Sequence, residues 1–373
     1  IPAIVGAGEK ADEIADGDLL LIDGAAGEVV AQPDEQTLAD FAERQKADAA
    51  HRAMLAQYKD KEGATSDGRR VIIEGNIGTP DDAVRVAELG GEGVGLFRSE
   101  FLFMDRTDLP SEEEQFAAYK KACEIMQGKP VIIRTLDIGG DKEVPALALE
   151  KEQNPFLGYR AIRICLNQPE LFLIQLRALL RAAQYGDLRI MFPMISSVDE
   201  VRGAKQVLEQ AKDMLTAEGV PFNPNVKVGI MVEIPVAAVC ADVLAKEVDF
   251  FSIGTNDLIQ YSCAVDRINE KISYLYRPLH PGVLRLIAMT AKAANENGIE
   301  VGVCGEMAGT AGMAPVLCGL GVTNLSMSAS AMLAAKADLA KHSCGECKEL
   351  ADKLLACASA SDAERIFADW RES

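Results

Sequence analysis

Several polar side chains that could do chemistry stand directly after short apolar runs, where buried strands would end. They are the arginines Arg98 and Arg134, the acids Glu233 and Asp257, and the thiol of Cys304. Planar guanidinium groups bind phosphate or carboxylate oxygens in a bidentate way. Carboxylates are the hard oxygen ligands that Mg²⁺ prefers, and a thiol of pKa about 8.5 can donate a proton. Together these groups suit a phosphorylated carboxylic acid that reacts through a carbanion-like centre.

Eight short apolar runs alternate with helix signals from about residue 70 onward. The predicted strands are 71–75, 93–97, 131–136, 189–193, 228–234, 250–253, 300–303 and 324–327. Continuous apolar runs are typical of strands buried on both faces. The alternation predicts an α/β fold, a (β/α)8 TIM-type barrel, and the count of eight favours the barrel over a doubly wound open sheet. Because barrel active sites lie at the C-terminal ends of the strands, the polar side chains should share one rim.

Capping signals predict where several helices begin. Thr79 followed by Pro80 predicts an N-cap, and Ser111 and Ser361, each with a glutamate three residues later, predict capping boxes. Further helices are expected at 171–185, 198–217, 236–246, 283–297 and 313–320. Before the barrel, a polar, alanine-rich stretch predicts a linker helix within 33–65, and 1–32 holds short β-type runs between glycine-rich turns. We therefore expect three parts: 1–32, 33–65 and 66–373.

Composition narrows the class of protein. The 373 residues carry a net charge of −19, with 49% apolar and 25% charged residues, which is ordinary for a folded chain and argues against an electrostatic nucleic-acid binder. No run of about 18 apolar residues suggests a membrane span. Nine scattered cysteines fit free thiols in a reducing cytoplasm. Cys344 and Cys347 form a CxxC pair near His342, which we interpret as a helix start rather than a zinc or redox site.

Longer motifs surround these side chains. They are 95–103 (GLFRSEFLF), 134–142 (RTLDIGGDK), 154–160 (NPFLGYR), 249–261 (DFFSIGTNDLIQY) with 265–267 (VDR), and 302–309 (GVCGEMAG). They resemble the phosphoenolpyruvate (PEP)-utilising enzymes, and the whole chain resembles enzyme I of the bacterial phosphotransferase system. That family moves the phosphoryl group of PEP to an enzyme histidine and then to a histidine-containing phosphocarrier protein in sugar uptake, and it releases pyruvate.

The resemblance also implies roles for single residues. It implies substrate binding by Arg98, Arg134, Asn256, Asp257, Arg267, Arg160 and Glu306. It implies that Glu233 and Asp257 bind magnesium and that Cys304 protonates C3 of the enolate. Lys142 is a further candidate for phosphate contact, although a solvated lysine is the simpler interpretation. The family is dimeric through its barrel, so a homodimer is expected.

One departure from the family concerns the phosphoryl acceptor. The acceptor histidine lies in a Gly-Gly-x-Thr-Ser-His-type segment of a swivelling domain, and His51, His280 and His342 lack such neighbours. We therefore interpret 1–32 as the remnant of that β-rich domain, 33–65 as the linker helix and 66–373 as the PEP-binding and dimerisation domain. The chain begins without methionine, and we expect a piece of a larger protein that cannot complete net transfer alone.

Three other interpretations stay open at this point. A pyruvate phosphate dikinase or PEP synthase shares the barrel, and upstream sequence would distinguish it. A citryl-type barrel lyase also uses Mg²⁺, an arginine and acids, but it lacks the cysteine segment. A module that senses PEP and signals through dimerisation is the non-enzyme alternative.

Overall fold

The computed structural model describes residues 4, 8–24, 26–104, 106–139, 144–147 and 149–372; Lys142 lies outside them. The chain divides into two compact units, Ile1–Gln57 and Tyr58–Ser373. The first unit contains a 3-10 turn η1 (Glu9–Glu13), an antiparallel hairpin of β1 (Leu20–Asp23) and β2 (Glu28–Ala31), and helix α1 (Glu35–Ala56). Helix α1 confirms that a helix lies within 33–65, and it begins where the Asp34 carboxylate accepts the Thr37 N–H at 2.8 Å.

The second unit is built on a closed barrel of eight parallel strands in the order β10-β3-β4-β5-β6-β7-β8-β9. The strands are β3 (Ile72–Ile77), β4 (Val94–Arg98), β5 (Val131–Arg134), β6 (Leu188–Phe192), β7 (Lys227–Val232), β8 (Phe250–Ile253), β9 (Glu300–Val303) and β10 (Asn324–Met327). All eight predicted strands are confirmed, the last three with the same bounds. Because β10 pairs with β3, the sheet is closed, and the open doubly wound alternative is wrong.

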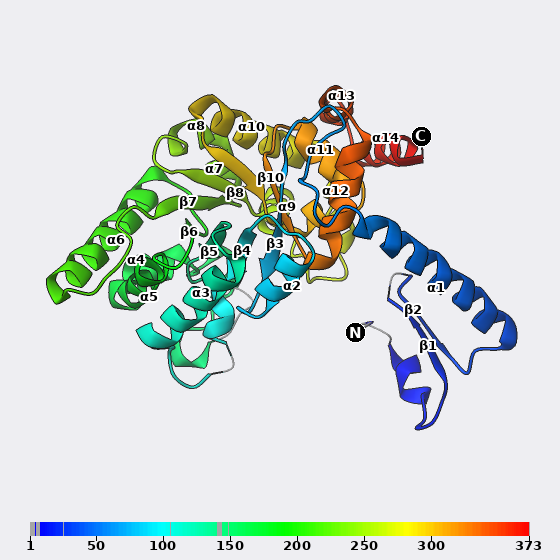
Figure 1. Cartoon of the computed structure of the whole chain (residues 1–373), viewed down its shortest axis with the longest axis horizontal. Helices are drawn as coiled ribbons and strands as arrows, with labels where there is room; N and C mark the ends of the chain where they lie inside the picture. Colours follow the sequence, from blue (N-terminus) through cyan, green and yellow to red (C-terminus); the bar gives the residue numbers. More distant parts are fainter. Residues whose placement is uncertain are drawn as a thin grey trace. The chain divides into compact units, whose positions relative to one another are not determined.

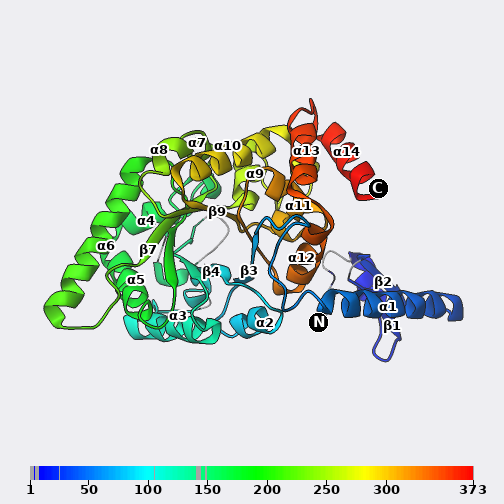
Figure 2. The ribbon, with the colours of Figure 1, turned by 45° about the horizontal axis from the view of Figure 1, so that its top comes forward.

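Helices surround the strands in both views of the ribbon (Figures 1 and 2). They are α2 (Asp82–Glu88), α3 (Glu112–Met126), α4 (Ile162–Asn167), α5 (Pro169–Ala182), α6 (Val198–Glu218), α7 (Pro235–Val239), α8 (Ala241–Leu244), α9 (Thr255–Cys263), α10 (Pro281–Asn297), α11 (Met313–Gly319), α12 (Met332–Lys341), α13 (Cys344–Leu355) and α14 (Ala360–Glu372). Short 3-10 turns are η2 (Ser99–Leu102), η3 (Pro145–Leu147), η4 (Pro155–Leu157), η5 (Ser273–Leu275), η6 (Glu306–Gly309) and η7 (Ala329–Ala331). The helix predicted at 236–246 is divided into α7 and α8.

Two predicted helix starts are confirmed. Ser111 caps α3 in a capping box, because its hydroxyl accepts the Glu114 N–H while the Glu114 carboxylate accepts the Ser111 N–H. Helix α13 begins at Cys344 after the cap Ser343, so the CxxC pair does mark a helix start.

Two predicted caps are wrong. Helix α2 begins at Asp82, whose carboxylate accepts the N–H groups of Gly78 and Thr79 at 3.0 and 2.8 Å; Thr79 is therefore a donor to this turn and not its cap. Helix α14 begins at Ala360, and the hydroxyl that accepts the Asp362 N–H at 3.1 Å belongs to Ser359. Ser361 lies inside that helix, two residues after the position that caps it.

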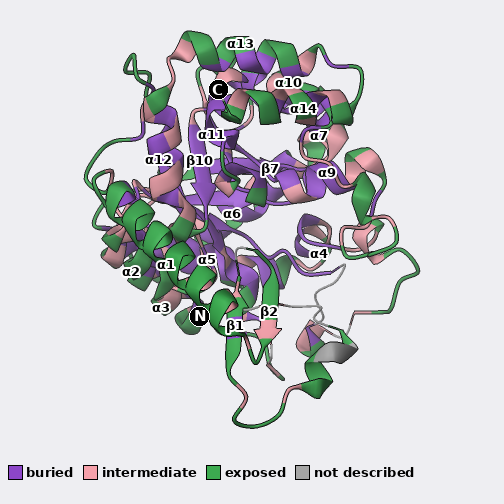
Figure 3. Cartoon of the chain, turned by 90° about the vertical axis from the view of Figure 1, so that its right-hand side faces the viewer, coloured by how far each residue is buried: buried purple, intermediate pink, exposed green. Residues whose placement is uncertain are grey.

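The barrel strands carry the core. Strands β5, β6, β8 and β10 are buried at every position, and in Figure 3 the buried residues gather in the strands and on the inner sides of the helices. Burial on both faces is what parallel barrel strands require, and it leaves their C-terminal ends as the place for polar side chains. Within the described residues, no helix is long and apolar enough to cross a membrane.

Candidate active site

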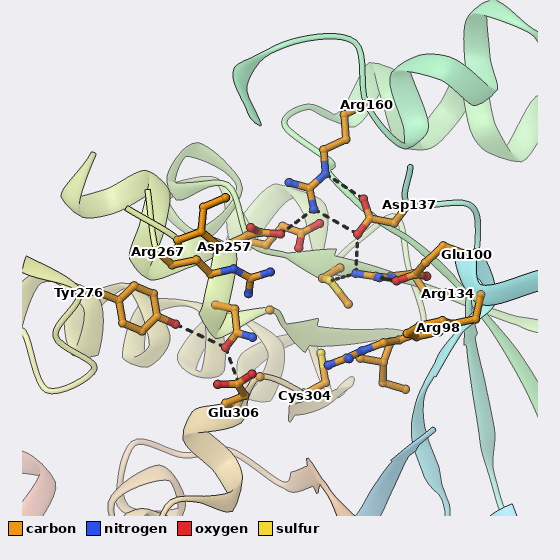
Figure 4. A pocket seen from close by; sticks show the side chains of 18 of the residues that line it. Arg98, Glu100, Arg134, Asp137, Arg160, Asp257, Arg267, Tyr276, Cys304 and Glu306 are labelled. Atoms are coloured by element: carbon orange, nitrogen blue, oxygen red, sulfur yellow. Dashed lines mark hydrogen bonds and ion pairs between the residues drawn. The ribbon is translucent and has the colours of Figure 1, made fainter. Parts of the chain in front are cut away.

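A cavity of about 430 Å³ lies at the C-terminal ends of the barrel strands. It is lined by nine of the residues singled out in the sequence: Arg98, Arg134, Arg160, Glu233, Asn256, Asp257, Arg267, Cys304 and Glu306. Most of them are labelled in Figure 4, where they come from elements that are far apart in the sequence. The closed barrel thus brings the predicted side chains to one rim, and their chemical roles stay predictions.

A chain of buried ion pairs crosses this cavity. Arg134, at the end of β5, pairs with Glu100, and its Nη1 lies 2.7 Å from Oδ2 of Asp137. Arg160 Nε donates to Asp137 Oδ1 at 2.9 Å, and its Nη2 donates to Asp257 Oδ2 at 2.8 Å. All five side chains are buried, so the alternation of charge is what makes their burial tolerable.

Two other arginines of the cavity are not engaged in this way. Across the described part of the chain, the guanidinium groups of Arg98 and Arg267 have no hydrogen bond or ion pair. The hydrogen bond that Arg267 donates to the Gln260 side chain comes from its main-chain N–H. Both are half-buried. Unpaired cations at the mouth of a cavity are available to an anion from solution.

The amide of Asn256 is oriented by two neighbours. Its Oδ1 accepts the main-chain N–H of Glu306 at 3.2 Å and the hydroxyl of Tyr276 at 3.5 Å. Because both donors hold the oxygen, the amide NH₂ of Asn256 is left as a donor toward a ligand. Tyr276 was not singled out in the sequence, since it lies 20 residues after Asn256 in a turn without a recognisable motif.

The two carboxylates expected to bind magnesium lie close together and are buried. Glu233 is 1% exposed, and its Oε1 accepts the main-chain N–H of Met194 at 2.7 Å. Burial, together with the negative charges of Asp257 and Asp137, raises the pKa of Glu233 to about 8. Oδ1 of Asp257 is buried and, among the residues that the structure describes, has no hydrogen-bond partner. A buried carboxylate oxygen without a donor is a position where a cation can bind.

The donor set of the cavity suits a divalent cation. The carboxylates of Glu233 and Asp257 are buried and line it. Hard oxygen ligands are those of Mg²⁺, so the residues fit this ion. Among the described residues, no group of three or more metal-ligating side chains is found. The remaining ligands of the cation would therefore come from the substrate or from water.

Cys304 follows β9 and is 2% exposed. Its N–H and its thiol both lie against the carbonyl of Ile253, at 3.1 and 3.8 Å. Burial raises the pKa of the Cys304 thiol to about 11, although Ser252 and the positive charge of Arg134 act in the opposite direction. The group is therefore a thiol at neutral pH, and it holds its proton more firmly than a free cysteine with a pKa of about 8.5.

Sequence reasoning missed Glu100 and Asp137 as members of the site. Glu100 stands two residues after Arg98, and Asp137 stands three residues after Arg134. The exposed fractions of the two acids are 1% and 0%. That spacing past a strand end was the available signal, but a carboxylate in such a position is usually a surface residue. Only the structure shows that both are ion-pair partners of Arg134.

Comparisons of the sequence with a family model and with curated proteins agree with one another. Residues 52–344 match the family model described as "PEP-utilising enzyme, PEP-binding domain". A protein of Priestia megaterium is 51% identical over 362 residues, which are 97% of this chain and 63% of that protein. Proteins of Bacillus subtilis (strain 168) and Staphylococcus carnosus (strain TM300) are 50% and 47% identical over 373 residues, which are 100% of this chain and 65% of each relative.

All three relatives are named phosphoenolpyruvate-protein phosphotransferase. The chain spans less than two thirds of their length, at 63–65%. The family model covers most of the second unit, including the whole barrel and the cavity at its C-terminal end. The chain therefore belongs to the PEP-utilising enzymes and carries their PEP-binding domain.

Proposed function

We propose that the chain is the PEP- and Mg²⁺-binding part of a phosphoenolpyruvate–protein phosphotransferase. In the whole protein, the phosphoryl group of PEP would pass to an enzyme histidine and then to a histidine-containing phosphocarrier protein, and pyruvate would be released. The name of the relatives supports this reading over a pyruvate phosphate dikinase or PEP synthase. The observation that carries the proposal is one cavity that combines unpaired arginines, a buried carboxylate pair and a protonated thiol.

The arginines and Asn256 would bind the substrate anion. Arg98 and Arg267 offer guanidinium groups that have no partner among the described residues, and on the same count the buried Nε–H of Arg134 has none. The NH₂ group of Asn256 adds a neutral donor. Glu233 and Asp257 would hold Mg²⁺, which when bound would neutralise charge that develops on the phosphoryl and enolate oxygens.

Cys304 would supply the proton that completes pyruvate. When the phosphoryl group leaves, the electron pair of the O–P bond stays on the enolate, and its C3 accepts the proton of the Cys304 thiol to become a methyl group. The thiolate that remains lies near the positive charges of Arg134 and Arg98, which favour it, and solvent returns its proton. A thiol that is fully protonated at neutral pH is the form this step requires.

The phosphoryl acceptor is proposed to lie elsewhere in the protein. Neither His280 nor His342 of the second unit lines the cavity, and the relatives are longer than this chain. We keep the interpretation of 1–32 as a remnant of the swivelling domain, 33–65 as its linker helix and 66–373 as the PEP-binding and dimerisation domain. A cytoplasmic homodimer is part of the proposal, and analytical ultracentrifugation tests the dimer.

Calorimetric titration of PEP with and without Mg²⁺ tests the function. We expect PEP binding that is strengthened by Mg²⁺ and reversed by a chelator. Glu233→Gln and Asp257→Asn should remove the effect of Mg²⁺, whereas Glu74→Gln, a buried glutamate outside the cavity, should retain it. PEP affinity that does not respond to Mg²⁺ in the unaltered chain would contradict the proposal.

A further inference from the structure

One oxygen of the Asp257 carboxylate, which we propose as a Mg²⁺ ligand, is already hydrogen-bonded to an arginine of the same chain. Nη2 of Arg160 lies 2.8 Å from Asp257 Oδ2, while Asp257 Oδ1 is buried and has no hydrogen-bond partner within the described part of the chain. A guanidinium group and a divalent cation on one carboxylate repel each other. Arg160 and the cation are therefore competitors for Asp257.

Arg160 has a second carboxylate to which it can withdraw. Its Nε donates to Asp137 Oδ1 at 2.9 Å, and Nη2, the atom bound to Asp257, also reaches Asp137 Oδ2 at 3.1 Å. Its Nη1 donates to the hydroxyl of Tyr261 at 3.1 Å, and that hydroxyl is itself fixed on the carbonyl of Phe156. Only one hydrogen bond must break for Nη2 to leave Asp257.

The main chain at Arg160 is held in place, so any change is confined to the end of the side chain. The N–H of Ala161 donates to the carbonyl of Ile138 at 3.0 Å. Gly139, with φ +106°, packs so closely that a Cβ there would lie 3.0 Å from the Cα of Arg160. Ala161 itself has φ 55°, a conformation that persists only where the surroundings fix it.

We propose that Arg160 is a positioning residue that couples the cation to the anionic substrate. Without a cation, its Nη2 occupies Asp257; a cation on Asp257 displaces it, and the freed donor then faces the substrate anion in the same cavity. Asp137 keeps the guanidinium in place throughout. The inference rests on the proposed function, and it explains why an anion and a cation would bind this cavity together rather than independently.

Binding of Mn²⁺ without PEP, followed by the electron paramagnetic resonance signal of free Mn²⁺, tests the competition. Arg160→Gln should bind Mn²⁺ roughly tenfold more tightly than the unaltered chain. The matched control is Arg134→Gln, which removes an equally buried guanidinium that pairs with Glu100 and Asp137 rather than with Asp257; its effect should be clearly smaller. If both variants bind Mn²⁺ more tightly by the same factor, the loss of one positive charge explains the effect, and the proposal is overturned.

Arg160→Lys is a second test of whether Arg160 competes with the cation for Asp257 or acts only through its positive charge. Lysine keeps the positive charge but lacks the fork that spans Asp137 and Asp257, so Mn²⁺ should still bind more tightly than in the unaltered chain. Unchanged affinity in this variant would overturn the proposal. If Arg160→Gln fails to fold, as judged by circular dichroism, Arg160→Lys and Arg134→Lys make the same comparison.

The coupling itself is measured by PEP titration with and without Mn²⁺. Because coupling between two ligands is reciprocal, the ratio of the two PEP affinities should fall in Arg160→Gln by several-fold. A normal ratio in this variant would overturn the role of Arg160 and leave the proposed function standing. A ratio of one in the unaltered chain would instead contradict the proposed function.

Discussion

The main-chain N–H of Met194 donates a hydrogen bond to the Glu233 carboxylate, with 2.7 Å between the nitrogen and Oε1. Met194 makes this contact from a left-handed backbone conformation, φ 56°, just after β6, and Glu233 follows the neighbouring strand β7. Strain of this kind in a non-glycine residue is concentrated at functional sites. One oxygen of Glu233 is thus fixed by the main chain, and the other, Oε2, lies beside Gly254.

Gly254→Ala should disturb Glu233 without unfolding the barrel. A Cβ at this position would lie 2.9 Å from Glu233 Oε2 and 3.0 Å from Met231 Sδ, while the φ of −83° suits alanine. We expect the Mg²⁺-dependent affinity for PEP to fall by roughly tenfold or more and stability by about 1 kcal/mol, measured by calorimetry and urea unfolding. Gly345→Ala, where the nearest atom is 3.9 Å away, is the matched control. Equal PEP affinity in both variants would show that Glu233 tolerates the displacement.

The barrel could be predicted from sequence because its strands are buried on both faces. The run 131–133 (VII), for example, is continuous in apolar residues, and the strand ends at the first polar residue, Arg134. Helix caps were less predictable, since several oxygens compete within one turn. Near α2, the side chains of Thr79, Asp81 and Asp82 were all possible caps, and the three-dimensional path of the turn decides that Asp82 accepts the N–H groups.

The rim of the site was predictable, but its pairing was not. Parallel strands must place Arg98, Arg134 and Cys304 at one end of the barrel, whatever their rotamers. Which guanidinium meets which carboxylate depends on side-chain geometry between segments 23 to 97 residues apart. The sequence therefore could not show that Arg134 and Arg160 are paired while the guanidinium groups of Arg98 and Arg267 have no partner in the part of the chain that the structure describes.

The Cys304 thiol should govern exchange of the methyl protons of pyruvate. By microscopic reversibility, the thiolate of Cys304 can remove the proton that the thiol delivers. Because the pKa of Cys304 is raised to about 11, the thiolate fraction rises about tenfold for each pH unit between 7 and 10. We expect the exchange of pyruvate methyl protons in D₂O with Mg²⁺, followed by proton NMR, to rise with the same slope.

Cys304→Ala should lose this exchange and keep the affinity for PEP, since the arginines and carboxylates are unchanged. In a full-length phosphotransferase, the same substitution should block pyruvate formation. Exchange that survives in Cys304→Ala above the rate of buffer alone would assign the proton to another group.

Glu74 should make stability depend on pH. This side chain of β3 is 2% exposed, and burial raises its pKa from 4.5 to about 7, an effect that Arg189 opposes and Glu300 reinforces. A folded pKa above the unfolded value means that the folded state binds the proton more tightly. The contribution of Glu74 to stability should therefore fall as pH rises from 4.5 to 7, by about 3 kcal/mol in total, and stay constant above that range.

Glu74→Gln should remove this dependence, because glutamine cannot ionise. Urea unfolding at pH 8 should find the variant more stable than the unaltered chain by about 2–3 kcal/mol, and at pH 4.5 the two should agree closely. A variant that is less stable at pH 8 would show that the ionised carboxylate is favourably paired in the barrel.

Gln175 of α5 should couple stability to substrate affinity. Its Oε1 accepts the N–H of Leu136 at 2.8 Å, and its Nε2 donates to the hydroxyl of Ser99 at 3.1 Å. These two residues immediately precede Asp137 and Glu100, the ion-pair partners of Arg134. Gln175→Leu leaves buried groups without partners, at about 1–3 kcal/mol each, and it loosens both segments, so stability and PEP affinity should fall together.

Gln115→Leu separates the two effects. Gln115 is as buried as Gln175 and also bonds Tyr119, but its other partner is the carbonyl of Pro110, at 3.0 Å. Its loss should lower stability by a similar 1–3 kcal/mol and leave PEP affinity within about twofold of the unaltered chain, since a factor of two is only about 0.4 kcal/mol. Urea unfolding and calorimetry on both variants decide the matter. If Gln115→Leu weakens PEP binding as much as Gln175→Leu, affinity follows global stability and not the hydrogen bonds that Gln175 makes to Leu136 and Ser99 in addition to the one that it donates to Tyr119.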